Sequence, residues 1–407
     1  MKAIGITCGI GSMLVGAREA GFDVVGNIEW RKYYHHRDSR DRNTFEENFP
    51  GAIFKRKLAD LTPEEVERMT GADIAFGHPE CGFYSNLSAT AQKNRNVVEM
   101  RKDPGDIPIF IELVKQLKPR FFVQDNLPKS LIGCEIQYWA EQLPEYDLFP
   151  EWVSNWGYGN VQKWRNRFFM IGALKEEKYI FCPGEIDRTF QLVDVLKNLP
   201  RANHDEHTLD GKTSKGAGIY GPETLTWAEY QKWMLANPEG ETIPYQSSTD
   251  GKWRKHIGWR KAFWYDYCPV LTGGCPIGHP KTGLPFSIRE RCRIQGLPDD
   301  FIIYGTKRDE GRKWDHMKNP AVIKQTGKCM PVQFCRYVAL QIANHIKGKD
   351  IEDPERPMKR IINSNGDVSK AKMWLCENNK YEDQKRVCYY CWKKVQCKKY
   401  KEIKLSK

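Results

Sequence analysis

Over the first 175 residues of the chain, apolar and polar positions alternate between a strand-like and a helix-like pattern. Short apolar runs, typical of buried strands, occur at residues 3–7, 22–28, 72–76, 120–123 and 167–171. Helix patterns lie between some of them, at residues 12–20, 63–69 and 107–117. Strands that alternate with helices predict an α/β fold, with a mostly parallel, Rossmann-like sheet covered by helices on both faces. Ligands of such sheets bind at the carboxyl ends of the strands.

The places where these strand and helix patterns stop and return divide the chain into four parts. We predict a first part of a catalytic, cofactor-binding domain over residues 1–174. Turn-rich segments and aromatic clusters then indicate an inserted domain over residues 175–285. Helical patterns at 287–295 and 331–346 predict a return to the first domain over 286–350. Residues 351–407 read as a Pro-containing linker followed by a small Cys-rich module.

Composition excludes several classes of protein. The chain has 407 residues, of which 40% are hydrophobic and 29% charged, as in a folded soluble protein. It has no apolar run of the roughly 20 residues that a membrane helix needs, and its first residues enter a strand pattern rather than a signal peptide. We therefore expect no membrane partner and a cytoplasmic location. We also expect a monomer in a bacterial or phage-infected cell, although composition does not decide either point. The 13 cysteines have no disulfide framework spacing over most of the chain, which favours reduced thiols.

The positive charge is concentrated at the C-terminus. Of the net charge of +12, residues 369–407 carry +8, from 12 basic and 4 acidic residues. A basic tail on a nearly balanced body favours a polyanionic partner such as nucleic acid. A solvated tail without a partner is the alternative.

Three features in order favour an adenosine-containing cofactor. Gly9 and Gly11 follow the first predicted strand, where glycines let backbone amides approach a ligand closely, although a tight turn without a ligand has the same pattern. Glu29 and Trp30 end the next strand, where a carboxylate can accept ribose hydroxyls and an indole can stack on a base. Asp60 could accept a hydrogen bond from an adenine amino group.

Further candidates follow the later strands. Cys81 lies in a Gly- and Pro-bounded loop after the third strand and is either a nucleophile or a buried small side chain. Asp125 ends the fourth strand, or forms an Asx turn before a proline. Arg165 and Arg167 occupy alternate positions entering the fifth strand, which suits phosphate or carbonyl binding and is equally common on a solvated strand edge.

In this order the motifs resemble the cytosine-C5 DNA methyltransferase family. The resemblance spans residues 1 to about 348 and rests on eight segments. They are residues 7–11, 29–30, 60–61, the loop around Cys81, 125–127, 165–167, 287–301 and 325–331. It implies a fold of the class I methyltransferase type, with the insert as a target-recognition domain, S-adenosyl-L-methionine as cofactor and double-stranded DNA as partner.

The resemblance also implies residue roles. Cys81 would be the thiolate that adds to carbon 6 of a cytosine flipped out of the duplex. Asp125 would hold N3 and the exocyclic amine, and Arg165 or Arg167 the O2 side. The cofactor would contact Thr7, Gly9, Ile10, Gly11, Glu29, Trp30, Asp60, Leu61, Gly77 and Lys328.

The departures from the family pattern are informative. Thr7 replaces the usual aromatic ring, Glu80 a proline and Asp125 a glutamate, while Lys163 stands at a glutamine position and Lys328 at an asparagine. A lysine about 4 Å from a sulfonium costs on the order of 1 to 4 kcal/mol of repulsion unless an anion offsets it. That anion is either Glu80 or a carboxylate on the transferable group, as in carboxy-S-adenosyl-L-methionine, which would make the product 5-carboxymethylcytosine.

Two basic segments remain. Residues 252–267 interleave five Lys and Arg with six aromatic residues, which suits a nucleic-acid surface or a small aromatic core. In the tail, four cysteines spaced C-x11-C-x2-C-x5-C predict structural zinc, against unliganded thiols; they are Cys376, Cys388, Cys391 and Cys397. We expect a DNA cytosine-C5 alkyltransferase. The alternatives are an inactive nucleic-acid-binding protein on the same fold and an RNA cytosine-C5 methyltransferase.

Overall fold

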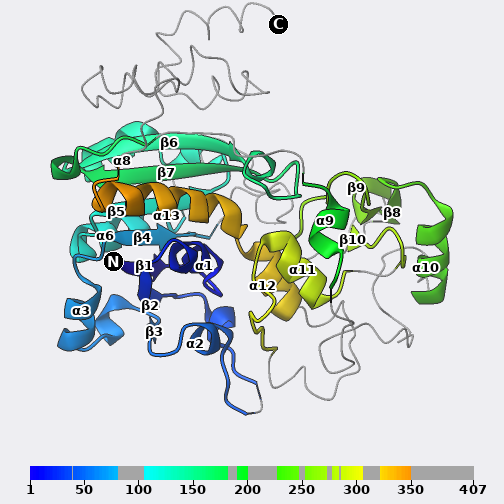
Figure 1. Cartoon of the computed structure of the whole chain (residues 1–407), viewed down its shortest axis with the longest axis horizontal. Coiled ribbons are helices and arrows are strands. Elements are labelled where there is room, and N and C mark those ends of the chain that lie inside the picture. Colours follow the sequence, from blue (N-terminus) through cyan, green and yellow to red (C-terminus); the bar gives the residue numbers. More distant parts are fainter. Residues whose placement is uncertain are drawn as a thin grey trace, which may run out of the picture.

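The computed structural model describes most of the chain before residue 350. The described residues are 1–38, 40–80, 105–181, 190–199, 227–246, 253–272, 277–283, 286–305 and 321–349. Their main element is a seven-stranded sheet in the order β3-β2-β1-β4-β5-β7-β6 (Figure 1). Its strands are β1 (Lys2–Ile6), β2 (Asp23–Ile28), β3 (Ile53–Lys55), β4 (Ile74–Gly77), β5 (Phe121–Asn126), β6 (Tyr146–Ser154) and β7 (Asn166–Leu174).

The sheet is mostly parallel, as the sequence predicts. The four pairings among β1 to β5 are parallel, and only β7 pairs antiparallel, with β5 and with β6. Two strands were not predicted from the apolar runs: β3 and β6, which form the two edges of the sheet. The first strand also ends one residue early, because Thr7 has a left-handed φ of 59° and turns the chain away from the sheet.

Successive strand residues enter two different hydrophobic cores, one on each face of the sheet. Phe121 packs into the core that contains α1 (Ser12–Glu19) and α13 (Val332–Ile346), whereas Phe122 packs into the core on the other side. The second core is covered by α6 (Ile107–Leu117) and α8 (Ile136–Gln142). This alternation is the side-chain period of a strand, and it explains why the central strands read as continuous apolar runs.

Helices α1 and α13 pack closely although they lie at opposite ends of the described chain. A Cβ on Gly16 of α1 would lie 2.6 Å from the backbone nitrogen of Arg336 in α13, so only glycine permits this approach. Before α13, the backbone nitrogen of Met330 donates to Oγ of Ser12 at 3.1 Å. The last described segment therefore supports the first turn of α1.

The other short helices lie between the strands or beyond the sheet. They are α2 (Thr44–Asn48), α3 (Pro63–Met69), α7 (Ser130–Gly133), α9 (Leu192–Leu196), α10 (Trp227–Ala236), α11 (Ile288–Gln295) and α12 (Ala321–Lys328). Single 3₁₀ turns occur at η1 (Lys32–His35), η2 (Leu58–Asp60), η4 (Asn155–Gly157) and η5 (Lys175–Glu177). Ser287 caps α11 through a reciprocal pair of hydrogen bonds with Glu290, so the predicted helix begins at the next residue.

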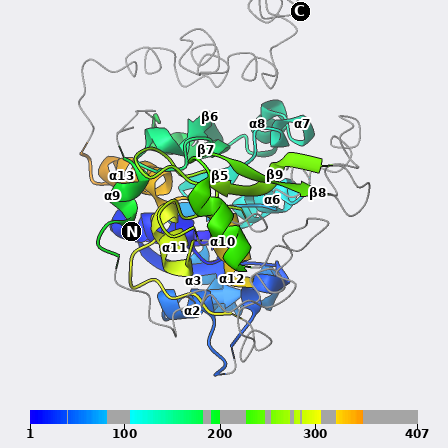
Figure 2. The same ribbon diagram turned by 90° about the vertical axis from the view of Figure 1, so that its right-hand side faces the viewer.

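A smaller sheet lies to one side of the large one. It has the order β10-β9-β8, formed by β8 (Thr242–Gln246), β9 (Trp253–Lys261) and β10 (Ile277–Gly278). Figure 2 shows this sheet and α10 on the side of the molecule that is turned to the viewer. A third hydrophobic cluster lies here, with Leu192, Leu271 and Ile294 among its buried residues. The proposed boundaries of an inserted domain at residues 175 and 285 stay a prediction.

Candidate active site

The loop after β1 is held in an unusual backbone conformation. Thr7, Gly9 and Gly11 all have positive φ angles, of 59°, 60° and 90°. A Cβ on Gly9 would lie 2.6 Å from Cζ of Tyr34, and one on Gly11 would lie 2.4 Å from Cε2 of Phe49. The two glycines are therefore required by rings of this chain as well as by the turn itself.

A buried ion pair ties this loop to the end of β2. The fully buried Glu29 accepts hydrogen bonds from the backbone nitrogen of Gly9 at 2.8 Å and from Nε of Arg31 at 2.8 Å. Nη2 of Arg31 lies 2.6 Å from the second oxygen of Glu29 and also donates to the carbonyl of Thr7. The carboxylate expected to accept ribose hydroxyls is thus held by Arg31 and the loop backbone.

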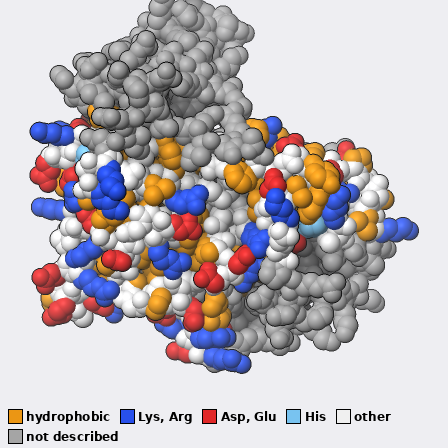
Figure 3. Space-filling view, in the orientation of Figure 1, with side chains coloured by type: hydrophobic (Ala, Val, Ile, Leu, Met, Phe, Trp, Pro, Cys, Tyr) orange, Lys and Arg blue, Asp and Glu red, His pale blue; other side chains and the backbone are white. Residues whose placement is uncertain are grey.

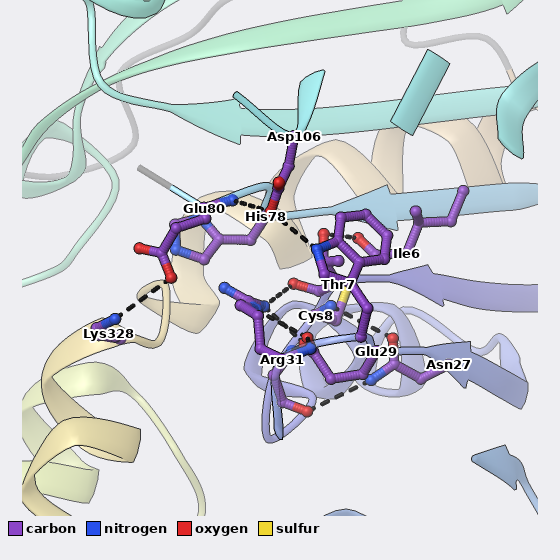
Figure 4. Close-up of polar contacts among 12 residues, drawn as sticks. Ile6, Thr7, Cys8, Asn27, Glu29, Arg31, His78, Glu80, Asp106 and Lys328 are labelled. Atoms are coloured by element: carbon purple, nitrogen blue, oxygen red, sulfur yellow. Dashed lines mark hydrogen bonds and ion pairs between the residues drawn. The ribbon is translucent and has the colours of Figure 1, made fainter. Parts of the chain in front are cut away.

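A second ion pair joins the segment before Cys81 to the end of α12 (Figure 4). Nζ of Lys328 lies 3.4 Å from Oε2 of Glu80 and 3.3 Å from the hydroxyl of Tyr33, over whose ring it sits at 4.9 Å. Burial opposes ionisation of Glu80, but Lys328, Arg31 and His78 outweigh it and hold its pKa below the ordinary value. Glu80 is therefore a carboxylate, and it faces the lysine that the sequence singles out.

Trp30 is held at its polar edge. Its Nε1 donates to Oδ2 of Asp106 at 2.9 Å, and the same oxygen accepts the backbone nitrogen of Glu80 at 3.4 Å. Trp30 also packs against the second hydrophobic core. Asp106 thus connects the expected cofactor-stacking residue with the segment that leads to Cys81.

Asp125 forms the centre of a buried polar cluster at the end of β5. Its Oδ1 accepts from Nε of Arg167 at 2.8 Å, and its Oδ2 lies 2.5 Å from Nη2 of Arg167 and 2.6 Å from Nδ1 of His78. Burial opposes ionisation, but Arg167 and His78 outweigh it and hold the pKa of Asp125 low. The cluster joins β5, β7 and the segment after β4.

The two arginines before and in β7 have different partners. Arg165 donates to the backbone carbonyls of Leu271 at 2.9 Å and Cys329 at 2.6 Å, whereas Arg167 binds Asp125. Both arginines are buried, so the alternative of a solvated strand edge is wrong. Arg165 links the strand to the smaller sheet region and to the segment before α13.

The remaining expected cofactor residues have varied surroundings. Asp60 is exposed and accepts the backbone nitrogen of Lys57 at 3.0 Å, which closes its own turn. Leu61 is half-buried against the second core, and Ile10 is buried in the first. Gly77 is the last residue of β4, where a Cβ would lie 2.0 Å from Cε2 of Phe110.

Several expected residues fall outside the part of the chain that is described. They are the nucleophile Cys81 and the proposed zinc ligands Cys376, Cys388, Cys391 and Cys397. Among the described residues, no group of three or more His, Cys, Asp or Glu side chains is arranged to hold a metal ion. Within the same residues, no helix has the length and apolar character needed to cross a bilayer.

Comparison with known proteins decides the family. Residues 1–344 match the family described as C-5 cytosine-specific DNA methylase. The chain belongs to this family. Type II methyltransferase M.MthTI of Methanothermobacter thermautotrophicus is 23% identical to it and covers 84% of this chain and 96% of its own length. Type II methyltransferase M.FnuDI of Fusobacterium nucleatum is 22% identical, over 86% of this chain and 96% of its own.

Solved structures show the same fold at lower identity. The DNMT2 of Spodoptera frugiperda, in a triple mutant, has a TM-score of 0.52 at 11% identity, and covers 84% of this chain and 99% of its own. The Entamoeba histolytica methyltransferase EhMeth has a TM-score of 0.52 at 12% identity, and the match covers 85% of this chain and 98% of its own. The class I methyltransferase fold expected from the sequence is therefore confirmed.

Four residues of the candidate site were not assigned a role from the sequence. Arg31, Tyr33, His78 and Asp106 all contact residues that the motifs identify. Arg31 directly follows Glu29 and Trp30, and His78 lies three residues before Cys81. For Arg31, Tyr33 and His78 the available signal was their closeness to the motifs, and Arg31 and His78 are also buried polar residues at strand ends. Asp106 lies 25 residues after Cys81, and the sequence offered no such signal for it.

Proposed function

We propose that the chain modifies carbon 5 of cytosine in double-stranded DNA, with methyl transfer as the reaction. The observation that carries this proposal is the buried cluster of Asp125 and Arg167 at the carboxyl end of β5, beside the segment that leads to Cys81. A fixed carboxylate and guanidinium suit the polar edge of a pyrimidine. Membership of the methylase family supports the same reaction.

In the proposed mechanism the target cytosine leaves the duplex, and the Cys81 thiolate adds to carbon 6. S-adenosyl-L-methionine, when bound, supplies an electrophilic methyl group. The residues present fit such a cation because Glu80 is held ionised near the loop after β1, and Trp30 offers an indole beside it. Asp60 and the loop glycines are the further proposed cofactor contacts.

The DNA would lie against aromatic and basic side chains on the face of the smaller sheet region. Tyr265 is 67% exposed and Trp164 is 49% exposed, and Nζ of Lys281 sits 5.4 Å from the ring of Tyr265. Figure 3 shows apolar side chains gathered over this region, whereas basic and acidic side chains are interspersed over the large sheet. By contrast, Lys261 is buried and donates to the carbonyl of Asn237, so it serves the fold.

Replacement of Cys81 tests the reaction. Cys81→Ser should abolish cytosine modification and leave DNA affinity within about threefold, because a hydroxyl is a far weaker nucleophile than a thiolate. Nucleosides of treated DNA are measured by mass spectrometry. The matched control is Cys134→Ser, a buried cysteine outside the site. Duplexes with 5-fluorocytosine should trap a covalent adduct with the wild type only; turnover by Cys81→Ser would refute the thiolate route.

A second candidate for the transferred group is carboxymethyl. The pair between Lys328 and Glu80 supports methyl transfer, because Glu80 already provides the anion that the lysine requires. However, its 3.4 Å separation exceeds the 2.7–2.9 Å typical of a charge-assisted bond, and the lysine side chain is 34% exposed. This looseness favours a lysine that exchanges Glu80 for a carboxylate on carboxy-S-adenosyl-L-methionine.

Competition between the two cofactors distinguishes the candidates. If Glu80 is the partner of Lys328 during turnover, S-adenosyl-L-methionine is preferred and Lys328→Asn changes the product ratio by less than about twofold. If the cofactor provides the partner, the wild type yields 5-carboxymethylcytosine. Lys328→Asn should then shift the preference toward methyl transfer by up to about 100-fold, the scale of one partly buried charge pair. A wild type that yields only 5-methylcytosine excludes the second candidate.

We further propose that the C-terminal segment binds one zinc ion through Cys376, Cys388, Cys391 and Cys397. This module would add non-specific DNA affinity that weakens as salt rises, because its charge of +8 acts on phosphates. Metal analysis of the full chain and of a chain ending at residue 356 tests the site. Equal zinc content in both would refute it.

A further inference from the structure

His78 and Asp125 form a buried carboxylate and imidazole pair at the strand ends of the site. Nδ1 of His78 lies 2.6 Å from Oδ2 of Asp125, and both side chains are almost fully buried. His78 immediately follows β4 and Asp125 lies in β5, so two neighbouring parallel strands fix the pair. The positions of both residues are therefore set by the sheet.

Asp125 cannot act as an acid in this arrangement. Its oxygens accept three hydrogen bonds, two from Arg167 and one from His78. The guanidinium and the imidazole hold its pKa low, and an ionised carboxylate only accepts hydrogen bonds. The proton that cytosine N3 needs during thiolate addition must therefore come from another group.

The same contacts determine which nitrogen of His78 carries a proton. Since Asp125 can only accept, the hydrogen of the short bond belongs to Nδ1 of His78. Nη2 of Arg167, 3.3 Å from Nδ1, is itself a donor and supplies no competing acceptor. The protonation state of the ring therefore changes at Nε2, as in other carboxylate and histidine dyads.

We propose that His78 is a catalytic acid and base that exchanges a proton with N3 of the target cytosine. This inference rests on the proposed function. As the Cys81 sulfur bonds to C6, the C5–C6 π electrons form a C4–C5 double bond and the C4–N3 π electrons move to N3, which takes the proton from Nε2. In the final step another base removes the C5 hydrogen, N3 returns its proton to His78, and the sulfur leaves C6 with its bonding electrons.

Several charged groups surround the imidazole. Asp125 lies 2.6 Å and Nη2 of Arg167 3.3 Å from Nδ1, and Glu80 on the same segment is a carboxylate. The thiols of Cys8 and Cys335 interact with Asp125, and both stay neutral because burial raises the pKa of each. The thiols therefore add no charge, and a pH dependence of the first step belongs to His78 and Cys81.

The test separates the addition step from group transfer. Enzymes of this proposed type should exchange the C5 hydrogen of the target cytosine with solvent when S-adenosylhomocysteine replaces the cofactor. We expect the rate in the wild type to fall on the alkaline side, as the imidazolium is lost. His78→Asn, whose amide can keep the bond to Asp125, should slow exchange by about 100-fold or more and lose the alkaline fall.

The controls make each outcome decisive. His345→Asn, remote from the site and bonded to the carbonyl of Glu177, should behave as wild type. His78→Ala should regain at least tenfold in rate when imidazole is added. His78→Asn with an unchanged rate and alkaline limb, or His78→Ala without rescue, overturns the inference while the proposed function stands. A wild type that neither exchanges nor modifies cytosine overturns the proposed function itself.

Discussion

Arg31→Met removes the guanidinium that neutralises Glu29 beneath the loop after β1 and keeps an apolar side chain of similar reach. The pair is almost fully buried, with exposed fractions of 6% for Arg31 and 0% for Glu29, and an N–O separation of 2.6 Å. Breaking a buried pair by removing one partner costs about 3–5 kcal/mol, since the other charge stays desolvated. The equilibrium constant for unfolding should therefore rise roughly 100- to 5,000-fold.

Urea denaturation followed by tryptophan fluorescence and circular dichroism measures this loss. The matched control is Arg37→Met, because Arg37 and Glu46 are only 2.5 Å apart but both side chains are 38% exposed. An exposed pair contributes at most about 1 kcal/mol, so that variant should unfold close to the wild type. Adding Glu29→Gln to Arg31→Met should recover most of the stability. A loss in Arg31→Met no larger than in the control would refute the reasoning.

Two further predictions concern packing and pH. Gly77→Ala should lower the free energy of unfolding by about 1–3 kcal/mol or more, since its Cβ would overlap the buried ring of Phe110; thermal unfolding measures this. Asp125 should contribute stability above its unfolded pKa of about 3.9 and lose it as pH falls through its lower folded pKa. Asp125→Asn should destabilise the chain at pH 7, where it removes the carboxylate beside Arg167. In this variant the free energy of unfolding should also fall less steeply with pH below about pH 4 than in the wild type. An equally steep fall in both proteins would contradict the prediction.

The sequence predicted the central strands and missed those at the edges, for one physical reason. Strands covered on both faces consist of apolar residues and are visible as runs, as at Phe121 and Phe122. The edge strand β3 has only three residues, and the edge strand β6 contains Pro150 and Glu151. The antiparallel direction of β7 could not be predicted either, because an apolar run does not indicate the direction of the strand it pairs with.

Candidate site residues were predicted from motif order, but their partners in the structure were not. Arg165 binds carbonyls that lie 106 and 164 residues further along the chain, and no local pattern encodes such contacts. The pair of Glu80 and Lys328 was weighed as one of two alternatives and is present at 3.4 Å, across 248 residues. Charge arguments gave this contact as one of two alternatives, because a lysine near a sulfonium needs an anion. No sequence argument assigned a role to Arg31.

The contact between α1 and α13 has a consequence for biosynthesis. A ribosome releases residues 1–30 long before residue 346, and until then the face of α1 around Gly16 has no helix to pack against. The bond from Met330 to Ser12 spans 318 residues, so the loop that would receive the cofactor is supported only after residue 330 has been translated. A nascent chain that ends before residue 325 thus has the earlier motifs in order but lacks both the motif at 325–331 and this support of the loop after β1.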